Sequence, residues 1–374
     1  MGILRTDKLS GIGTDGPVFD GVTRLDTQGY FVPPPGTTDQ RSAGITTTQG
    51  AIRFNTDSQK LEFYAQDQWF EMVIDTPALG TSSDTGAGAR GVFVGGSSPG
   101  ILYDTIDYIN IASTGNAVDF GNLSAGREYI GALSSSTRGV FGGGDLGPYT
   151  NIIEYVTIAS TGNSVDFGDL TVARHFAAGI SNSTRGVFAG GEQPAVQTVM
   201  DYITISSTGN AVTFGSLTAA KYSFGRGASP TRGIYAGGAP NTSLIEFFTI
   251  STLGNSISFG NLTLARNTIT GCSNATRGIF GGGYSGGSSN IIDYITIATQ
   301  GNAVDFGDLT QQRYYNDSCA SSTRAVFGGG WTGGPIYNII DYVNILTQGN
   351  AVDFGDLFET RYAISACSNA HGGL

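Results

Sequence analysis

The chain has 374 residues and a mass of 38.8 kDa, and its composition excludes several protein classes. Glycine contributes 58 residues, about double the ~7% share of an average protein, whereas charged residues make up only 13%, about half of the usual ~25%. With 11% aromatic residues and no G-X-Y period, the chain is neither a coiled coil, nor disordered, nor collagen-like. This composition indicates many short strands joined by tight turns, and hence an all-β fold.

The charge and the distribution of apolar residues argue against nucleic acids and membranes as partners. The formal net charge is −11, and no run of Lys or Arg could follow a phosphate backbone, so we expect no nucleic-acid binding. No apolar stretch approaches the ~20 residues of a membrane helix, and the N-terminus lacks the apolar core of a signal peptide. We therefore expect neither membrane insertion nor Sec-type secretion. The three cysteines, Cys272, Cys319 and Cys367, argue against a disulfide scaffold and favour synthesis in a reducing compartment.

The first 75 residues share nothing with the rest of the chain. Residues 1–43 are predicted to form an extended arm, with polyproline II character at 31–38. Residues 44–75 are predicted to form a small β-meander with turns at 56–59 and 65–67, and 76–88 a linker. A segment this short buries little core by itself, so we expect a partner or oligomerisation to order it. Candidate docking residues are Leu4, Phe19, Phe31, Phe54 and Trp69.

Residues 89–374 consist of a repeat of about 47 residues. Its first element is of the type Arg-Gly-Val-Phe-Gly-Gly, with arginines spaced by 48, 47, 47, 45 and 47 (Arg90, Arg138, Arg185, Arg232, Arg277, Arg324). The second carries an acid before an aromatic residue (Asp107, Glu154, Asp201, Glu246, Asp293, Asp341). The third follows a Gly-Asn turn, and the fourth follows a basic residue (Arg127, Arg174, Lys221, Arg266, Arg313, Arg361). All four elements are short, β-branched or aromatic, and bounded by turn residues, which predicts four strands per repeat.

The two ends of the repeat region complement each other. The segment before Arg90 has no strand pattern, whereas residues 362–368 form a good strand with no partner after it. A solenoid would instead need polar caps at both ends. The sequence therefore predicts a six-bladed β-propeller over 89–374, closed when strand 362–368 joins the first blade.

The repeat resembles Kelch-type repeats, in which a strand ending in Gly-Gly precedes a strand with a Tyr and a strand with an aromatic residue. The last position carries Phe here, where Kelch repeats usually carry Trp. The repeat sequence over residues 89–374, of the type Thr-Arg-Gly-Val-Phe-Gly-Gly followed by Ile-Asp-Tyr-Ile-Thr-Ile and Gly-Asn-Ala-Val-Asp-Phe-Gly-Asp-Leu, is similar to Kelch-like proteins of tailed bacteriophages, notably those of marine cyanobacteria. The 36–73 segment is similar to a β-module of phage virion proteins. The resemblance implies a virion protein made in the host cytoplasm. Its implied partners are other tail, fibre or neck proteins, further copies of itself, and a host surface glycan or protein.

Few residues could support catalysis or hold a metal ion. The two histidines, His175 and His371, are not at metal-ligand spacing, and no Walker loop, EF-hand or G-x-S-x-G motif is present. We expect no cofactor, no metal and no enzymatic activity; a glycan-active enzyme is the alternative. The cysteines fall at positions equivalent to Leu133 and Ile180 on the innermost strand, which favours small buried side chains over a metal or redox cluster. The Arg90-type arginines should bond turn carbonyls or an acid in their own or the next blade; the alternative is a ring of arginines that binds anions.

The repeats differ from one another mainly in two sets of loops. Because strands alternate in direction, the loop after Gly-Gly and the loop after the basic residue should open on one face of the propeller. Variable loops on a rigid scaffold often bind ligands, and Tyr or Trp there suit a sugar ring or a protein surface, although the loops could equally be unconstrained. Candidate ligand-binding residues are Tyr103, Tyr149, His175, Tyr222, Tyr284, Tyr314, Trp331, Tyr337 and Tyr362. The function expected is that of a non-enzymatic virion structural protein, with a receptor-binding module as the alternative.

Overall fold

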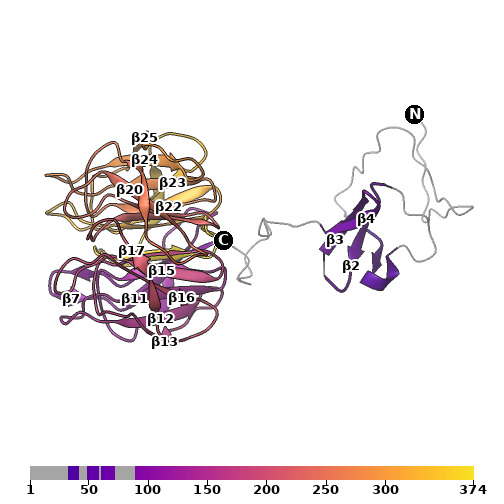
Figure 1. Cartoon of the computed structure of the whole chain (residues 1–374), viewed down its shortest axis with the longest axis horizontal. Coiled ribbons are helices and arrows are strands. Elements are labelled where there is room, and N and C mark those ends of the chain that lie inside the picture. The colour runs from indigo at the N-terminus through magenta and orange to yellow at the C-terminus, as the bar shows by residue number, and fades with distance from the viewer. Residues whose placement is uncertain (1–32, 42–48, 59, 72–88) are drawn as a thin grey trace, which may run out of the picture. The chain divides into compact units, whose positions relative to one another are not determined.

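The structure is a computed structural model that describes residues 33–41, 49–58, 60–71 and 89–374. The chain divides into two compact units, Met1–Thr76 and Pro77–Leu374, which Figure 1 shows in one picture. The described residues form eight sheets, seven of them four-stranded, and a single turn of 3₁₀ helix (η1, Thr38–Gln40). The predicted all-β class is confirmed.

The N-terminal unit contains one small sheet. Its strands are β1 (Pro35–Gly36), β2 (Ile52–Asn55), β3 (Lys60–Ala65) and β4 (Gln68–Glu71), in the order β1-β2-β3-β4. β2, β3 and β4 are antiparallel, and β1 runs parallel to β2. Gln66 and Asp67 both have positive φ, which suits the two-residue turn between β3 and β4.

The Glu62 side chain is the polar centre of this unit. It is fully buried, accepts hydrogen bonds from Arg41 and Asn55, and lies near the Arg53 guanidinium. The hydrogen bond from Arg41 lowers the pKa of Glu62, against the opposing effect of burial. Of the candidate docking residues, Phe54 on β2 and Trp69 on β4 are half-buried, whereas Leu4, Phe19 and Phe31 lie outside the described residues.

Five four-stranded antiparallel sheets of the C-terminal unit follow one another along the chain. They consist of β10–β13 (Gly131–Ser134, Arg138–Gly142, Ile152–Thr157, Val165–Asp169), β14–β17 (Ala178–Ser181, Arg185–Ala189, Val199–Thr204, Val212–Ser216), β18–β21 (Gly225–Ala228, Arg232–Ala236, Leu244–Thr249, Ile257–Asn261), β22–β25 (Thr270–Ser273, Arg277–Gly281, Ile291–Thr296, Val304–Asp308) and β26–β29 (Asp317–Ala320, Arg324–Gly328, Ile339–Asn344, Val352–Asp356).

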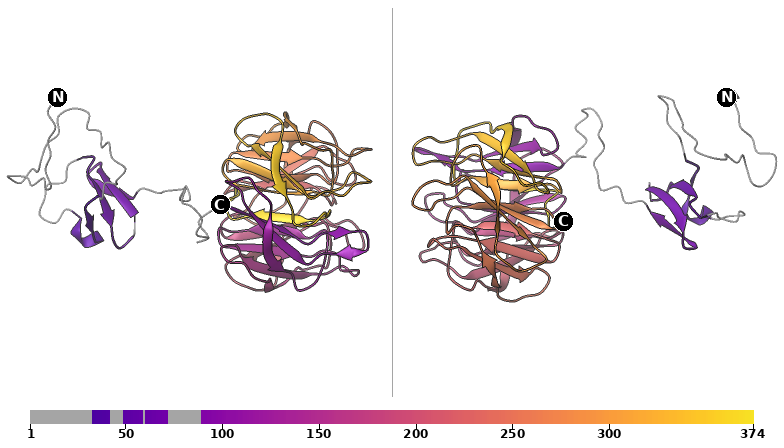
Figure 2. Two further views of the ribbon diagram at one scale, coloured as in Figure 1. Left: turned by 180° about the vertical axis from the view of Figure 1, so that it is seen from behind. Right: turned by 90° about the horizontal axis from the view of Figure 1, so that it is seen from above.

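The sixth sheet joins the two ends of the C-terminal unit. Its order is β30-β5-β8-β9, with bounds Ser365–Ser368, Arg90–Val94, Thr105–Asn110 and Val118–Asn122. β30 pairs antiparallel with β5, and Figure 2 shows this yellow strand beside the purple first repeat. A two-stranded hairpin, β6 (Ser97–Ser98) and β7 (Ile101–Leu102), extends the loop after β5. β30 is shorter than the predicted strand because Ala363 is left-handed (φ 55°), which interrupts an extended chain.

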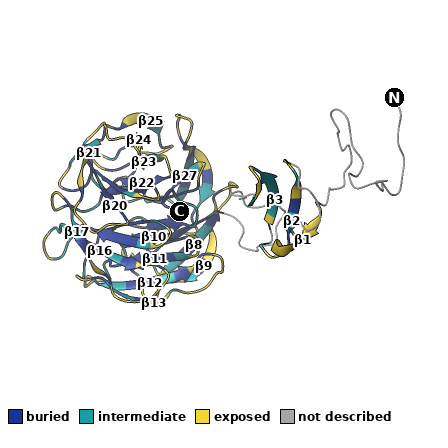
Figure 3. Ribbon diagram, turned by 45° about the vertical axis from the view of Figure 1, so that its right-hand side comes forward, coloured by how far each residue is buried: buried dark blue, intermediate teal, exposed yellow. Residues whose placement is uncertain are grey.

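The first strands of the six sheets lie side by side. β10 contacts β14, β14 contacts β18, β18 contacts β22, β22 contacts β26, β26 contacts β30, and β30 contacts β10. These strands are almost entirely buried, and Figure 3 shows the dark-blue interior against the yellow loops. The core consists of apolar residues packed between neighbouring sheets, such as Phe141 and Phe188, which are fully buried.

The Gly-Gly pairs allow neighbouring sheets to approach closely. Gly143 has φ 71°, and a Cβ at this position would lie 2.4 Å from the Arg174 carbonyl oxygen of the next sheet. Gly144 donates its backbone N–H to that same oxygen. The repeated glycines are therefore required at these positions both by the left-handed backbone and by the contact.

Candidate functional site

The two sets of variable loops lie on one face, as expected from the strand directions. In every sheet, the residue after the basic residue forms an isolated antiparallel bridge with the residue after Gly-Gly: Glu128 with Asp145, His175 with Glu192, Tyr222 with Ala239, Asn267 with Tyr284, Tyr314 with Trp331, and Tyr362 with Ser97. We call this side the variable face. The same pair of backbone hydrogen bonds forms this bridge in all six sheets, whereas the side chains and the lengths of the loops differ.

Ten rings on the variable face contact one another, and we call them the aromatic patch: Tyr129, Tyr149, His175, Phe176, Tyr222, Tyr284, Tyr314, Tyr315, Trp331 and Tyr362. Tyr149 stacks on His175 with centroids 4.3 Å apart, and Trp331 stacks on Tyr362 at 5.4 Å. The patch therefore includes seven of the nine candidate residues from the sequence. Tyr103 and Tyr337 make no ring contact with it in the described part of the chain.

Three members of the patch, Tyr129, Phe176 and Tyr315, were missed by the sequence analysis. They stand two residues after the basic residue, where all six repeats have a left-handed residue with φ between 48° and 58° (Tyr129, Phe176, Ser223, Thr268, Tyr315, Ala363). The Tyr129 and Phe176 centroids are 3.8 Å apart, and those of Tyr129 and Tyr315 are 5.4 Å apart. Aromatic residues at one repeated position were visible in the sequence, but the backbone turn that brings them together was not.

Two cavities lie along the axis of the C-terminal unit, both lined by residues of the six first strands or of the loops before them. The mouth cavity, about 70 Å³, lies at the variable face under Tyr129, Phe176 and Tyr315. The tail cavity, about 50 Å³, lies toward the opposite ends of the same strands and is lined by His371 among others. Each is large enough for a few water molecules.

An ion pair separates the two cavities. Arg226 of β18 donates two hydrogen bonds to Asp317 of β26, at 2.9 and 2.7 Å, and a third to the Ala366 carbonyl of β30 at 2.7 Å. Asp317 also accepts from Thr270 and from two backbone N–H groups. Burial opposes the charge of Arg226, but Asp317 outweighs burial and raises the pKa of the guanidinium. The pair closes the floor of the mouth cavity and leaves no net charge there.

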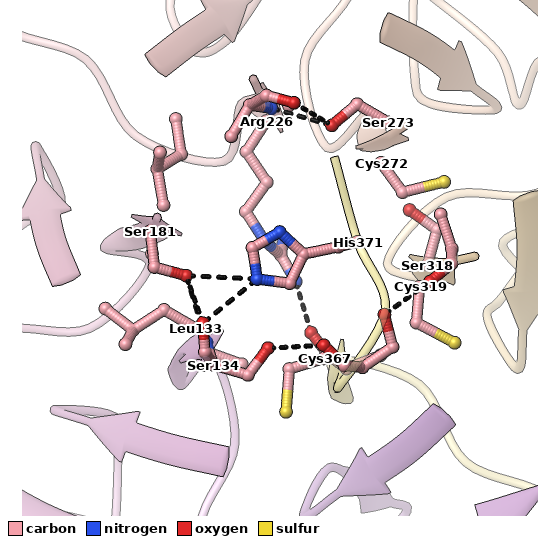
Figure 4. A pocket seen from close by; sticks show the side chains of 18 of the residues that line it. Leu133, Ser134, Ser181, Arg226, Cys272, Ser273, Ser318, Cys319, Cys367 and His371 are labelled. Carbon is pink, nitrogen blue, oxygen red and sulfur yellow. Dashed lines mark hydrogen bonds between the residues drawn. The ribbon is translucent and has the colours of Figure 1, made fainter. Parts of the chain in front are cut away.

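The C-terminal tail fills the other end of the axis. His371 lies in the centre of the first strands in Figure 4, with Nε2 3.0 Å from the Ser134 carbonyl oxygen and 3.3 Å from the Ser181 hydroxyl. Gly372 donates its N–H to the Ser273 carbonyl at 2.8 Å. Burial lowers the pKa of His371 to about 4, so its imidazole is neutral at pH 7. Nothing in the sequence pointed to this position, because the contacts join segments far apart in the chain.

The three cysteines are buried thiols that face the sheets. Their sulfur atoms point away from His371 in Figure 4. A Cβ at Gly91 would lie 2.5 Å from the Cys319 sulfur, and one at Gly139 3.1 Å from that of Cys367. Burial raises the pKa of Cys272 and of Cys367 to about 12. Among the described residues, no group of three or more His, Cys, Asp or Glu could hold a metal ion.

Each of the six Arg90-type arginines donates a hydrogen bond to a backbone carbonyl of a neighbouring sheet. Arg138 donates to the Ile205 carbonyl of the next sheet at 2.9 Å, and its guanidinium stacks 4.5 Å from the Tyr155 ring. Arg324 makes the same bond to Ile111, which lies in the first repeat. Of the two partners that the sequence left open, the turn carbonyl is correct. The one-for-one match with the recurrent acids is coincidental, because those acids pair with the other set of basic residues.

This second set forms one buried ion pair in each sheet. The pairs are Arg127–Glu154, Arg174–Asp201, Lys221–Glu246, Arg266–Asp293, Arg313–Asp341 and Arg361–Asp107. The basic residue precedes the first strand and the acid lies on the third, so each pair ties the loop before a sheet to that sheet. The charge of each of these six basic residues is therefore paired with a buried carboxylate of the scaffold.

The variable face therefore combines a connected set of aromatic side chains with a uniformly hydrogen-bonded backbone, and the acidic Glu128, Asp145 and Glu192 are among its bridge residues. No helix in the described ranges combines the length and the apolar character needed to cross a bilayer. Neither the models of known protein families nor the curated protein sequences include a match to this chain.

Proposed function

We propose that the six sheets of the C-terminal unit are the blades of a closed β-propeller. The cyclic order of contacts among the first strands supports a ring, since β30 touches both β26 and β10. The hydrogen bond from Arg324 of the last repeat to Ile111 of the first is the one that every other neighbouring pair makes, as in Arg138 to Ile205. A ring accounts for this repetition better than an open stack does, because an open stack has two unlike ends.

We further propose that the chain is a non-enzymatic structural protein of a tailed-bacteriophage particle. In this proposal the N-terminal unit docks to the tail, a fibre or the neck, and the propeller displays its variable face outward. The observation that carries this proposal is that the differences between the repeats are concentrated on one side: six similar four-stranded sheets support one face on which the loops and their side chains vary. The phage assignment depends on the resemblance of the repeat and of the 36–73 segment to phage proteins.

The docking role is tested by removing residues 1–75. The truncated chain should keep its thermal unfolding transition, because the described contacts of the C-terminal unit need none of these residues, but it should be missing from purified particles. Particles that incorporate the truncated chain at the level of the full chain would refute the docking role.

The aromatic patch favours a second function, the recognition of a host surface glycan or protein. Tyr149 and Tyr284 are each 37% exposed and belong to one connected set of rings. Such surfaces often carry most of the free energy of binding. A glycan array probed with the full chain and with a Trp331→Ala/Tyr314→Ala variant tests this function, and identical patterns would contradict it. Tyr337→Ala, outside the patch, is the matched control.

A further inference from the structure

We propose that the mouth cavity binds one neutral hexopyranose residue, whose ring packs against the outward-facing surface of the Tyr129, Phe176 and Tyr315 cluster while its hydroxymethyl group enters the cavity. The inference rests on the second proposed function, glycan recognition, and assigns it a place and a ligand class. The cavity lies at the centre of the aromatic patch, where the six left-handed residues surround the axis.

The apolar half of the mouth fits the face of a sugar ring. The Tyr129 and Phe176 rings pack against each other with centroids 3.8 Å apart, and the Tyr315 centroid lies 5.4 Å from Tyr129 and 6.0 Å from Phe176, so the three half-buried rings form one cluster with an outward-facing surface. The C–H face of a pyranose packs against such rings, while its hydroxyl groups point sideways. The remaining positions around the mouth hold the smaller Ser223, Thr268 and Ala363, which leave that side less covered.

The polar half of the mouth contains buried side-chain groups that have no hydrogen-bond partner among the described residues. Asn316 lines the cavity with 6% of its surface exposed, and neither amide atom has a hydrogen-bond partner among the described residues; the same holds for the buried Ser223 hydroxyl. The equivalents of Asn316 in the other repeats are apolar and buried (Ile130, Ala177, Phe224, Ile269, Ile364). A buried amide without a hydrogen-bond partner lowers the stability of the fold. A ligand with hydrogen-bond donors and acceptors would supply the missing partners. The Asn316 amide oxygen lies against the neighbouring sheet, where a Cβ at Gly282 would come within 3.0 Å of it, and both Asn316 and Ser223 line the cavity.

Charge selects a neutral ligand. The only cation in the cavity wall, Arg226, is engaged by Asp317 and by the Ala366 carbonyl, so no free positive charge faces the mouth. The chain as a whole carries a net charge of −11, which repels acidic sugars. Because the ion pair and the C-terminal tail occupy the axis below, a ligand enters only from the variable face, and the cavity admits one side group rather than a whole chain.

The test uses the full chain and saturation-transfer NMR with the methyl glycosides of glucose, galactose and mannose. Methyl xyloside, which lacks the hydroxymethyl group, and methyl glucuronide, which is charged, are the matched probes. At least one hexoside should bind, and the xyloside and the glucuronide should each bind at least about tenfold more weakly. Asn316→Leu should weaken hexoside binding at least about tenfold, since two hydrogen bonds are lost. Its melting temperature should be equal or higher, because leucine matches the apolar residues of the other repeats.

Two results would overturn the inference. One is the absence of binding by every hexoside. The other is binding that Asn316→Leu leaves unchanged, or that the xyloside equals. Tyr103→Phe, outside the patch, is the control and should bind as the unaltered chain does. Neither result bears on the docking role, which the incorporation of truncated chains into particles tests separately, and a positive glycan array alongside a negative hexoside panel would place recognition elsewhere on the variable face.

Discussion

The Arg361 guanidinium donates a hydrogen bond of 2.6 Å to the carboxylate of Asp107, a residue 254 positions earlier in the chain. Both side chains are fully buried. In the other five sheets the same pair joins residues that are near in sequence, such as Arg127 and Glu154. In the sixth sheet the pair joins the end of the repeat region to its beginning. The ion pair that recurs in every sheet therefore also links the two ends of the repeat region.

Replacing Asp107 with asparagine should destabilise the C-terminal unit strongly. The change leaves Arg361 buried without its counter-charge, and breaking a buried ion pair on one side costs about 3–5 kcal/mol. Guanidinium denaturation of the full chain measures the loss. Asp119→Asn, an exposed residue on β9, is the control and should cost less than about 0.5 kcal/mol. Equal losses in the two variants would contradict a special role for the pair.

Arg138→Lys should weaken the contact between two neighbouring sheets. Lysine keeps the charge but loses the planar guanidinium that bonds the Ile205 carbonyl and stacks on Tyr155, and we expect a loss of about 1–2 kcal/mol. A double-mutant cycle with Tyr155→Leu should give a coupling of about 0.5–1 kcal/mol between the two side chains. Additive effects of the two changes would show that the stacking contributes nothing.

The cysteines should be unreactive while the protein is folded. Burial raises the pKa of Cys272 and Cys367 to about 12, and that of Cys319 well above its ordinary value, so almost no thiolate exists near pH 8. Ellman's reagent should therefore label none of the three cysteines rapidly in the folded protein. It should label all three after unfolding in guanidinium chloride. Rapid labelling of any cysteine in the folded protein would contradict the packing described for it.

The docked C-terminal tail should weaken as the pH falls. Burial holds the pKa of His371 at about 4, below the ~6.5 of an exposed histidine, so the released tail binds a proton more readily than the docked tail. Docking is then most favourable above about pH 6.5 and loses stability down to about pH 4. Hydrogen exchange at the Gly372 amide, corrected for the intrinsic pH dependence of exchange, measures this loss.

A variant provides the reference for the released tail. A Cβ at Gly373 would lie 1.9 Å from the Ser181 carbonyl oxygen, so Gly373→Ala should release the tail at every pH. Its Gly372 amide should exchange at the rate of an unprotected amide. An NMR titration of His371 in the unaltered chain should give a pKa of about 4; a value near 6.5 would contradict the docked position.

Much of the fold was predictable because its signals are local. The strand patterns, the Gly-Gly pairs and the Gly-Asn turns recur in every copy and depend on neighbouring residues. The partners of the arginines were not predictable in the same way. Each repeat has one arginine of the Arg138 type and one acid of the Glu154 type, which suggests that the two pair. Arg138 instead bonds a carbonyl of the next sheet, and Glu154 pairs with Arg127. Spacing along the chain orders these residues but does not say which side chains meet.

The amino-acid sequence by itself determined the repeat, its four strands and the complementarity of its two ends, since β-propensity, glycine conformations and turn chemistry act within a few residues. It also indicated the face on which the loops vary. Only the tertiary structure decided that Tyr129, Phe176 and Tyr315 meet at the axis, that Arg226 reaches Asp317, and that His371 enters among the first strands. Each of these contacts joins different sheets, so its geometry is set by how the sheets pack rather than by the order of residues in any one repeat.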